Sequence, residues 1–134
     1  MDARLDKTTN SMYTPGTAPY EIVFYLSPRG ESPVDEFLDS LEERPRAKIE
    51  RFMEQLQEHG PDLPRPYADV LRGKIRELRV PYGKRHCRLL YFFQGRSIVM
   101  TSGFVKKTPA VPQEEIGRAE RRMADWIARR PPED

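Results

Sequence analysis

The spacing of hydrophobic residues in the first half of the chain predicts one strand and two helices. Residues 20–26 are rich in β-branched and aromatic side chains and are followed by a turn cluster, which predicts a strand. Helical spacing follows over residues 33–41 and again over residues 47–59, with Pro45 between the two stretches and Gly60 after the second. We therefore expect two helices, arranged as an antiparallel hairpin.

The second half of the chain predicts a meander of three strands and a final helix. The predicted strands cover residues 70–80, interrupted by Gly73, then residues 87–93 and residues 98–104. A last apolar stripe over residues 112–129 has helical spacing, with acidic residues early and arginines late, as the helix dipole favours. The predicted order is β-α-α-β-β-β-α. This is an α+β domain with a mainly antiparallel sheet that packs on the helical hairpin and leaves its other face partly open.

Length and composition fit one soluble domain. The chain has 134 residues, of which 37% are hydrophobic, and no apolar run approaches the ~20 residues that a membrane helix needs. We expect a disordered leader over residues 1–19, one domain over residues 20–130 and a flexible tail over residues 131–134. The single cysteine, Cys87, favours a reducing cytoplasm. No metal-ligand spacing or cofactor motif occurs, so we expect neither a metal nor a cofactor.

Charge is divided unevenly along the chain. Residues 31–58 contain nine acidic and four basic residues, a net −5, for which ordinary solvated helix faces are the simpler interpretation. Residues 70–107 contain ten basic residues and one acidic residue, a net +9, although the whole chain carries +2. The ten are Arg72, Lys74, Arg76, Arg79, Lys84, Arg85, Arg88, Arg96, Lys106 and Lys107. Such a concentration of positive charge attracts nucleic acids or phosphate-rich ligands.

Arg88 is the one charged residue in the otherwise apolar strand over residues 87–93. Alternate residues of a strand share a face, so Glu77 and Arg79 lie together on the preceding strand. Two interpretations of Arg88 stand. It forms an ion pair with Glu77 that holds the sheet, or its guanidinium binds a phosphate. The sequence leaves the register between the two strands open.

The loop over residues 81–86 joins an aromatic ring to two cations and an imidazole. As a hairpin connection it needs only polarity and a glycine, which is the simpler interpretation. The functional alternative is a tip that stacks a base on Tyr82 and contacts phosphates through Lys84 and Arg85, with His86 exchanging protons.

Two lysines follow the last predicted strand. Lys106 and Lys107 are either solvated or converge with Arg79 and Arg88 on one phosphate, where they would stabilise the charge that develops in a transition state. The parity of the strands permits the second interpretation but does not require it.

Three motifs follow one another along the chain. They are Leu71-Arg72-Gly73-Lys74-Ile75-Arg76-Glu77-Leu78-Arg79-Val80, Cys87-Arg88-Leu89-Leu90-Tyr91-Phe92-Phe93, and Gly103-Phe104-Val105-Lys106-Lys107-Thr108 with Pro112, Glu115 and Ile116 after it. In this order, behind a β-α-α start, they resemble the "Leu-Trp-Glu-Leu-Arg", "Arg-[Ile/Leu]-x-Tyr" and "Phe-x-Lys-Lys-Thr" motifs of the phage-derived, HigB-like branch of the RelE/ParE toxin superfamily. These are the toxins of bacterial type II toxin-antitoxin pairs. The resemblance spans residues 20–126.

The resemblance implies a RelE-like fold and a ribosome-dependent endoribonuclease, in which the ribose 2′-hydroxyl of messenger RNA attacks the neighbouring phosphate without a metal. By position it implies that Arg88 is a phosphate ligand, that Arg79 and Glu77 form the Glu-Leu-Arg pair, and that Lys106 and Lys107 form the basic exit of the last strand. Taken together with the charge pattern, we expect Arg79, Arg88, Lys106, Lys107 and His86 to be catalytic and Lys74, Arg76, Tyr82, Lys84 and Arg85 to bind RNA. Arg76 departs from the family, which often has tryptophan there. No tyrosine follows the Lys106 loop, so the proton-transfer residue is open between His86, Tyr82 and a lysine.

The resemblance also implies partners: a small helix-turn-helix, HigA-like antitoxin, the ribosome and messenger RNA. Two other functions stay open, because one fold hosts several activities. The first is a ParE-like inhibitor of DNA gyrase without nuclease chemistry, and the second is a non-catalytic RNA-binding protein. The net charge of +9 over residues 70–107 favours RNA over gyrase.

Overall fold

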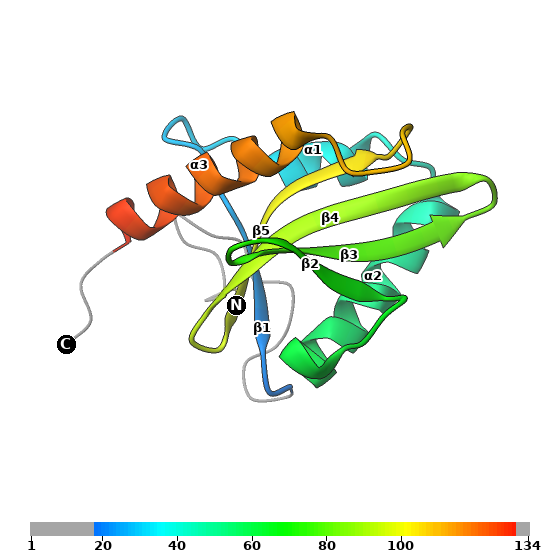
Figure 1. Ribbon diagram of the computed structural model, residues 1–134, viewed down its shortest axis with the longest axis horizontal. Coiled ribbons are helices and arrows are strands. Elements are labelled where there is room, and N and C mark those ends of the chain that lie inside the picture. Colours follow the sequence, from blue (N-terminus) through cyan, green and yellow to red (C-terminus); the bar gives the residue numbers. More distant parts are fainter. Residues whose placement is uncertain (1–17, 131–134) are drawn as a thin grey trace.

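Five strands form one sheet that lies between two layers of helices in the computed structural model (Figure 1). The structure describes residues 18–130, so most of the predicted leader and the whole predicted tail lie outside the described residues. The elements are β1 (Glu21–Phe24), α1 (Pro33–Asp39), α2 (Glu43–His59), the 3-10 turn η1 (Gly60–Asp62), β2 (Ala68–Arg72), β3 (Ile75–Tyr82), β4 (Arg85–Gln94), β5 (Ser97–Val105) and α3 (Gln113–Arg129).

The sheet is mostly antiparallel, in the order β1-β5-β4-β3-β2. Neighbouring strands from β2 to β5 are antiparallel, whereas β1 runs parallel to β5, with Glu21 opposite Ser97. The predicted α+β class and mainly antiparallel sheet are therefore confirmed.

The predicted single strand over residues 70–80 is wrong, because it forms two strands, β2 and β3. Gly73 has a φ of +56°, a left-handed conformation that glycine adopts without strain, and it forms the turn of a tight hairpin with Lys74. Arg72 consequently lies opposite Ile75. Gly73, which the sequence presents as an interruption of one strand, therefore lies at the turn where the chain reverses direction.

The predicted helix break at Pro45 is also displaced. α1 ends at Asp39 and α2 begins at Glu43, so Pro45 lies in the first turn of α2, where a backbone N–H has no helical partner in any case. α1 contacts mainly β5, and α2 contacts β3 and β1. The two helices therefore pack side by side on the sheet, not as a hairpin held by contacts between them.

α1 and α2 cover one face of the sheet and bury the larger core. This core contains Ile22, Phe24, Val34, Leu38, Ile49, Met53, Leu56, Leu78, Val80, Cys87, Leu89, Tyr91, Ile98 and Met100. Gly103 of β5 allows the ring of Phe37 on α1 to approach, since a Cβ at this position would lie 2.5 Å from Cδ2 of Phe37. The close approach of α1 to β5 thus depends on a missing side chain.

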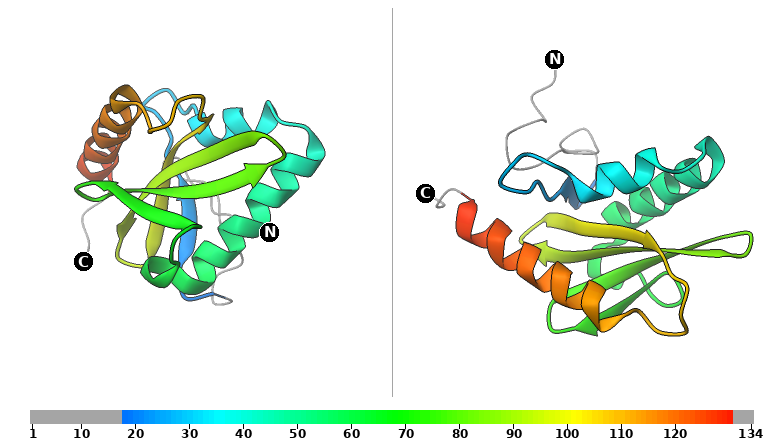
Figure 2. Two further views of the ribbon diagram at one scale, coloured as in Figure 1. Left: turned by 45° about the vertical axis from the view of Figure 1, so that its right-hand side comes forward. Right: turned by 90° about the horizontal axis from the view of Figure 1, so that it is seen from above.

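α3 packs on the opposite face and covers part of it, in agreement with the expectation that this face is partly open. Figure 2 shows α3 on one side of the sheet and the other helices on the other. Trp126 meets Phe92 edge to face, with ring centroids 5.8 Å apart, and the hydroxyl of Tyr25 donates to Asp125 at 2.6 Å. Arg129 also ion-pairs with Asp125 at 2.8 Å. These contacts anchor the C-terminal half of α3.

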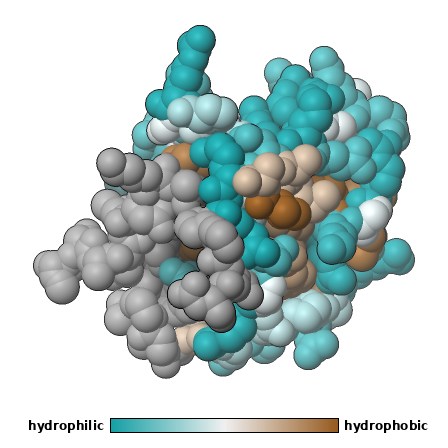
Figure 3. All heavy atoms as spheres, turned by 90° about the vertical axis from the view of Figure 1, so that its left-hand side faces the viewer, coloured by the Kyte–Doolittle hydropathy of each residue, from teal (hydrophilic) through white to brown (hydrophobic). Residues whose placement is uncertain are grey.

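The surface around the end of α3 is mostly hydrophilic. Figure 3 views this side and shows hydrophobic atoms as separate small areas among mostly hydrophilic residues. On α3 itself, the exposed large hydrophobic residue is Ile127. Among the described helices, none combines the length and apolar character that crossing a membrane requires.

Candidate functional site

One face of the sheet gathers four of the five predicted catalytic residues. Arg79 of β3 lies directly opposite Arg88 of β4. The backbone N–H of Lys106 donates to the carbonyl of His86 at 2.8 Å, one ladder step beyond β5. Because alternate residues of a strand share a face, Arg79, His86, Arg88 and Lys106 lie on the same side of the sheet as α3. We call these four residues the basic face.

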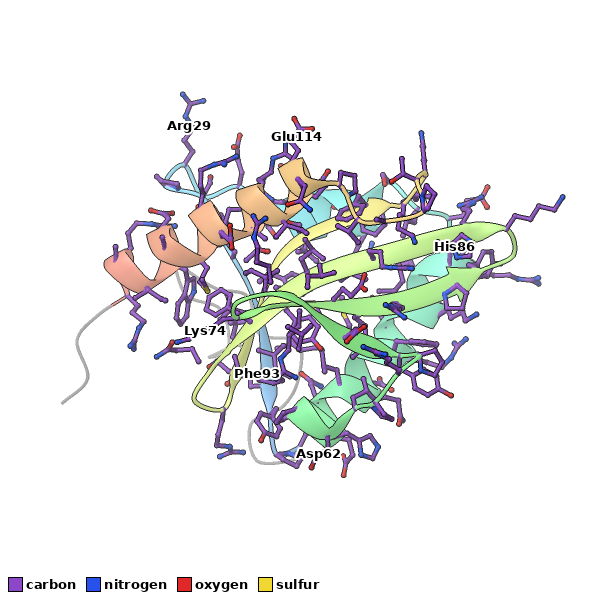
Figure 4. The ribbon with its side chains drawn as sticks, in the orientation of Figure 1. Arg29, Asp62, Lys74, His86, Phe93 and Glu114 are labelled. Atoms are coloured by element: carbon purple, nitrogen blue, oxygen red, sulfur yellow. The ribbon has the colours of Figure 1, made fainter. Side chains whose placement is uncertain are left out.

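The basic face lies at the end of the sheet that α3 does not cover. The hairpin of β3 and β4 extends past the first turn of α3 (Figure 1), and Figure 4 shows His86 near the tip of this hairpin. His86 is exposed, and the side chain of Arg79 is 32% exposed. A ligand can therefore reach His86 and Arg79, whereas Arg88 lies deeper and is buried.

Glu77 provides the counter-charge at the basic face. Its carboxylate is only 3% exposed and lies 3.0 Å from Nε of Arg79 and 2.9 Å from Nε of Arg88. The ion-pair interpretation of Arg88 is thus confirmed, and its side chain is only 10% exposed. The Nε of Arg88 and Oε1 of Glu77 are close but not aligned for a hydrogen bond. Charge, more than a directed hydrogen bond, holds this pair.

Asp69 and Arg65 extend the cluster and were missed by sequence analysis. Asp69 of β2 lies opposite Glu77 and accepts from Arg79 at 3.3 Å, and Arg65 lies 3.0 Å from the same carboxylate oxygen. The backbone N–H of Val70, and then the guanidinium groups of Arg65 and Arg79, hold the pKa of Asp69 below its ordinary value. Three guanidinium groups and two carboxylates leave one positive charge on the cluster.

The two lysines after β5 differ in their surroundings. Nζ of Lys106 donates to the carbonyl of Pro109 at 3.0 Å, inside the loop that leads to α3. Lys107 is exposed and lies beyond the ladder, so the strand register does not assign it to a face. The structure brings Lys106, but not Lys107, into the basic face.

The five predicted RNA-binding residues do not form one surface. Lys74 lies in the turn between β2 and β3, at the other end of the hairpin from His86 (Figure 4). Arg76 lies on the opposite face of the sheet, with its guanidinium 5.3 Å from the ring centroid of Phe93. The remaining three, Tyr82, Lys84 and Arg85, lie at the tip of the β3–β4 hairpin, where strand parity puts Tyr82 and Arg85 on the face opposite to the basic face. We call these three residues the hairpin tip.

Much of the positive charge over residues 70–107 has partners. Arg72 ion-pairs with Glu120 of α3 at 2.8 Å, and Arg96 donates to the carbonyls of Pro19 and Ala18. Within residues 18–130, Lys74, Lys84, Arg85 and Lys107 have no hydrogen-bond or ion-pair partner. The uncompensated charge is therefore divided between the β2–β3 turn, the hairpin tip and the segment just after β5.

Tyr91, the tyrosine of the Arg-x-x-Tyr motif, is a core residue. It is buried on the face opposite to Arg88, and burial raises its pKa to about 12. In the part of the chain that the structure describes, His, Cys, Asp and Glu do not gather into a group of three that could hold a metal ion.

A pocket of about 380 Å³ lies elsewhere, between α2 and the loop that leads to β2. It is lined by Phe52, Gln55, His59, Asp62, Leu63, Pro64 and Tyr67. His59 is the last residue of α2, as its predicted helix-terminal position implied. The pocket shares no residue with the basic face.

The fold and the basic face define a small α+β protein with a candidate phosphate-binding surface on an antiparallel sheet. The chain belongs to the phage-derived Gp49-like family (DUF891), whose model matches residues 36–124. This match covers every candidate residue of the basic face and the hairpin tip, and the family is toxin-like and related to RelE. Comparison with curated proteins finds no match.

Proposed function

We propose that the protein is the toxin of a toxin-antitoxin pair and that it cleaves messenger RNA on the ribosome. One observation carries the proposal: Arg79 and Arg88 are direct cross-strand partners on the sheet face that α3 covers only in part, together with His86 and Lys106. Two guanidinium groups at one position suit a phosphodiester, since guanidinium binds phosphate oxygens in a fixed geometry. Membership of a toxin-like family supports the same function.

The proposed reaction needs positioning, charge and two proton transfers. The ribose 2′-oxygen attacks the adjacent phosphorus, and the bond from phosphorus to the 5′-oxygen breaks. The products are a 2′,3′-cyclic phosphate and a 5′-hydroxyl. Arg79 and Arg88 bind the phosphate oxygens and neutralise the charge that develops on them. His86 and Lys106 take the proton from the 2′-hydroxyl and deliver one to the leaving oxygen. This mechanism uses no metal.

The hairpin tip binds the RNA next to the scissile phosphate. Tyr82 provides a ring on which a base stacks, and Lys84 and Arg85 contact backbone phosphates, the combination used by proteins that bind single-stranded RNA. Lys107 adds charge at the same edge. The proposed partners are the ribosome, messenger RNA and a helix-turn-helix antitoxin, which assigns the toxin to the cytoplasm.

The test is cleavage by the purified protein of messenger RNA on translating ribosomes, read by mapping transcript 5′ ends. We expect codon-linked cuts, and a loss of about 10²-fold or more in cleavage rate for Arg79→Gln, the size expected for removal of one charge-stabilising donor. Arg29→Gln is the matched control and should cleave RNA at the wild-type rate, since Arg29 lies in an exposed turn away from the basic face (Figure 4).

Two outcomes would reject the proposal. Intact transcripts, together with inhibition of DNA gyrase and a DNA-damage response in cells, would establish the ParE-like alternative. RNA binding without any cut would establish the non-catalytic alternative.

A further inference from the structure

Glu77 occupies a central place between the two arginines of the basic face. Like charges directly opposite each other on neighbouring strands repel, yet Arg79 and Arg88 are direct cross-strand partners. The carboxylate of Glu77 approaches both, through Oε2 to Arg79 and through Oε1 to Arg88. One buried carboxylate thus holds two guanidinium groups.

Glu77 engages each arginine at the Nε atom and leaves terminal nitrogens for a ligand. Arg79 uses Nε for Glu77 and Nη2 for Asp69. Arg88 approaches Glu77 with Nε and donates from Nη1 to the carbonyl of Cys87 at 3.3 Å. Among the described residues, neither Nη1 of Arg79 nor Nη2 of Arg88 donates a hydrogen bond. One terminal nitrogen on each side of Glu77 is free to donate.

The charge of Glu77 works against RNA binding. A carboxylate close to both guanidinium groups repels a phosphate that binds them, so its removal should strengthen the attraction for RNA. If Glu77 nevertheless increases the rate of cleavage, it must do so by orienting the two guanidinium groups. Donors that are already fixed in place need no reorganisation during the reaction.

We propose that Glu77 is a positioning residue for phosphodiester cleavage: it fixes the guanidinium groups of Arg79 and Arg88 so that the free terminal nitrogen of each binds the same phosphate. This inference rests on the proposed function. It predicts that Glu77 increases the rate of cleavage while its charge weakens the binding of RNA.

The experiment measures both quantities for Glu77→Gln, which keeps the shape of the side chain and removes its charge. We expect a dissociation constant for a single-stranded RNA that is unchanged or smaller. We expect a single-turnover cleavage rate on the ribosome that falls by about 10²-fold, the size of effect that misplaced catalytic groups produce. Glu77→Asp keeps the charge on a shorter side chain and should restore part of the rate.

The matched control is Glu120→Gln, which breaks the ion pair with Arg72 outside the basic face and should change neither quantity. A purely structural role of Glu77 predicts instead that RNA affinity and rate fall together, in proportion to the folded fraction. That result, or an unchanged rate, would overturn the inference.

A second measurement keeps the inference separate from the proposed function. If the wild-type protein cleaves no RNA, the proposed function fails, but hydrogen exchange of the arginine Nε–H groups still reports on positioning. Exchange at Nε–H of Arg79, which donates to Glu77, should be slow in the wild type and faster in Glu77→Gln. Equal exchange in both proteins, with both folded, would overturn the role of Glu77 by itself.

Discussion

Arg79 and Arg88 face each other at one register position of β3 and β4, although both carry positive charge. The arrangement is stable because the buried carboxylate of Glu77 lies within 3.0 Å of both guanidinium groups. The same cluster is therefore part of the framework of the sheet and part of the candidate site. Stability and activity must be measured separately for every variant of it.

Replacement of Arg88 tests the structural half of this cluster. Arg88→Met should lower the free energy of unfolding by about 3 kcal/mol, because loss of one partner leaves a buried carboxylate with less compensation. Urea denaturation measures the change. The double variant Glu77→Gln, Arg88→Met should recover part of the loss, since no buried carboxylate remains. A single-variant loss below about 1 kcal/mol would place this ion pair among weak surface pairs.

Neutralisation of the hairpin tip tests its proposed role in binding phosphate. Lys84→Gln with Arg85→Gln should weaken binding to single-stranded RNA of any sequence and reduce the slope of log affinity against log salt by about 2, one for each cation that is neutralised. The cleavage rate of bound RNA should stay near that of the wild type. Lys74→Gln, at the other end of the hairpin, is the control. An equal reduction in slope for Lys74→Gln would mean that RNA follows the whole hairpin.

His86 and Lys106 compete for the role of proton-transfer residue. Replacement of the residue that moves the proton should lower the single-turnover rate by about 10²–10⁴-fold, the usual contribution of general acid-base catalysis. We expect this for His86→Gln and a smaller loss for Lys106→Met, because Nζ of Lys106 already donates to the carbonyl of Pro109. The reverse order of the two rates would transfer the role to Lys106.

The contact between Gly103 and Phe37 makes a prediction about packing. Gly103→Ala should destabilise the protein by about 1–3 kcal/mol, because a methyl group meets the Phe37 ring at 2.5 Å. Thermal unfolding measures this, and Phe37→Leu in the same chain should relieve part of it. Gly117→Ala is the matched control. It lies in α3 with only ordinary contacts, so the same substitution should stabilise the protein by about 0.5–1 kcal/mol.

The cluster of Tyr25, Asp125 and Arg129 predicts a pH window for stability. Arg129 and then Tyr25 hold the pKa of Asp125 below its ordinary value, so this contribution is present above about pH 4 and is lost as the pH falls through the folded-state pKa. Burial and then Asp125 raise the pKa of Tyr25, so its contribution is present below about pH 10 and is lost as the pH rises through the folded-state pKa.

Denaturation across this pH range checks the cluster. Asp125→Asn should remove the part of the acid-induced loss that belongs to Asp125. The loss at high pH should become smaller but persist, because burial also raises the pKa of Tyr25. An unchanged acid profile would show that other carboxylates, such as Asp69, determine the acid stability.

Hydrophobic spacing was sufficient to locate most elements, because β3, β4 and β5 contribute apolar residues to both cores and α3 buries one apolar stripe. It failed where a single residue allows two structures. Gly73 reads equally well as a weak point in a strand or as a hairpin turn, and only pairing of β2 with β3 decides between them. A proline such as Pro45 can either end a helix or lie in the first turn of the next one. Here α2 begins at Glu43, so Pro45 lies in its first turn.

Strand parity predicted which side chains of the candidate site share a face, but it could not predict which residues lie opposite each other on neighbouring strands. Parity put Glu77 with Arg79 and made an ion pair with Arg88 one of two interpretations, which the structure confirms. The direct opposition of Arg79 and Arg88 depends on the register set by the Gly83–Lys84 turn. The contribution of Asp69 depends on a third strand, whose start lay outside the predicted boundary.

The parallel pairing of β1 with β5 has a consequence for synthesis of the chain. The hairpins from β2 to β5 join neighbouring segments and can form in the order in which they leave the ribosome, whereas Glu21 must wait for Ser97. Until then Ile22, Val23 and Phe24 have no strand partner. A chain stalled before β5 therefore presents an unpaired apolar strand, which marks an incomplete copy for chaperones and proteases.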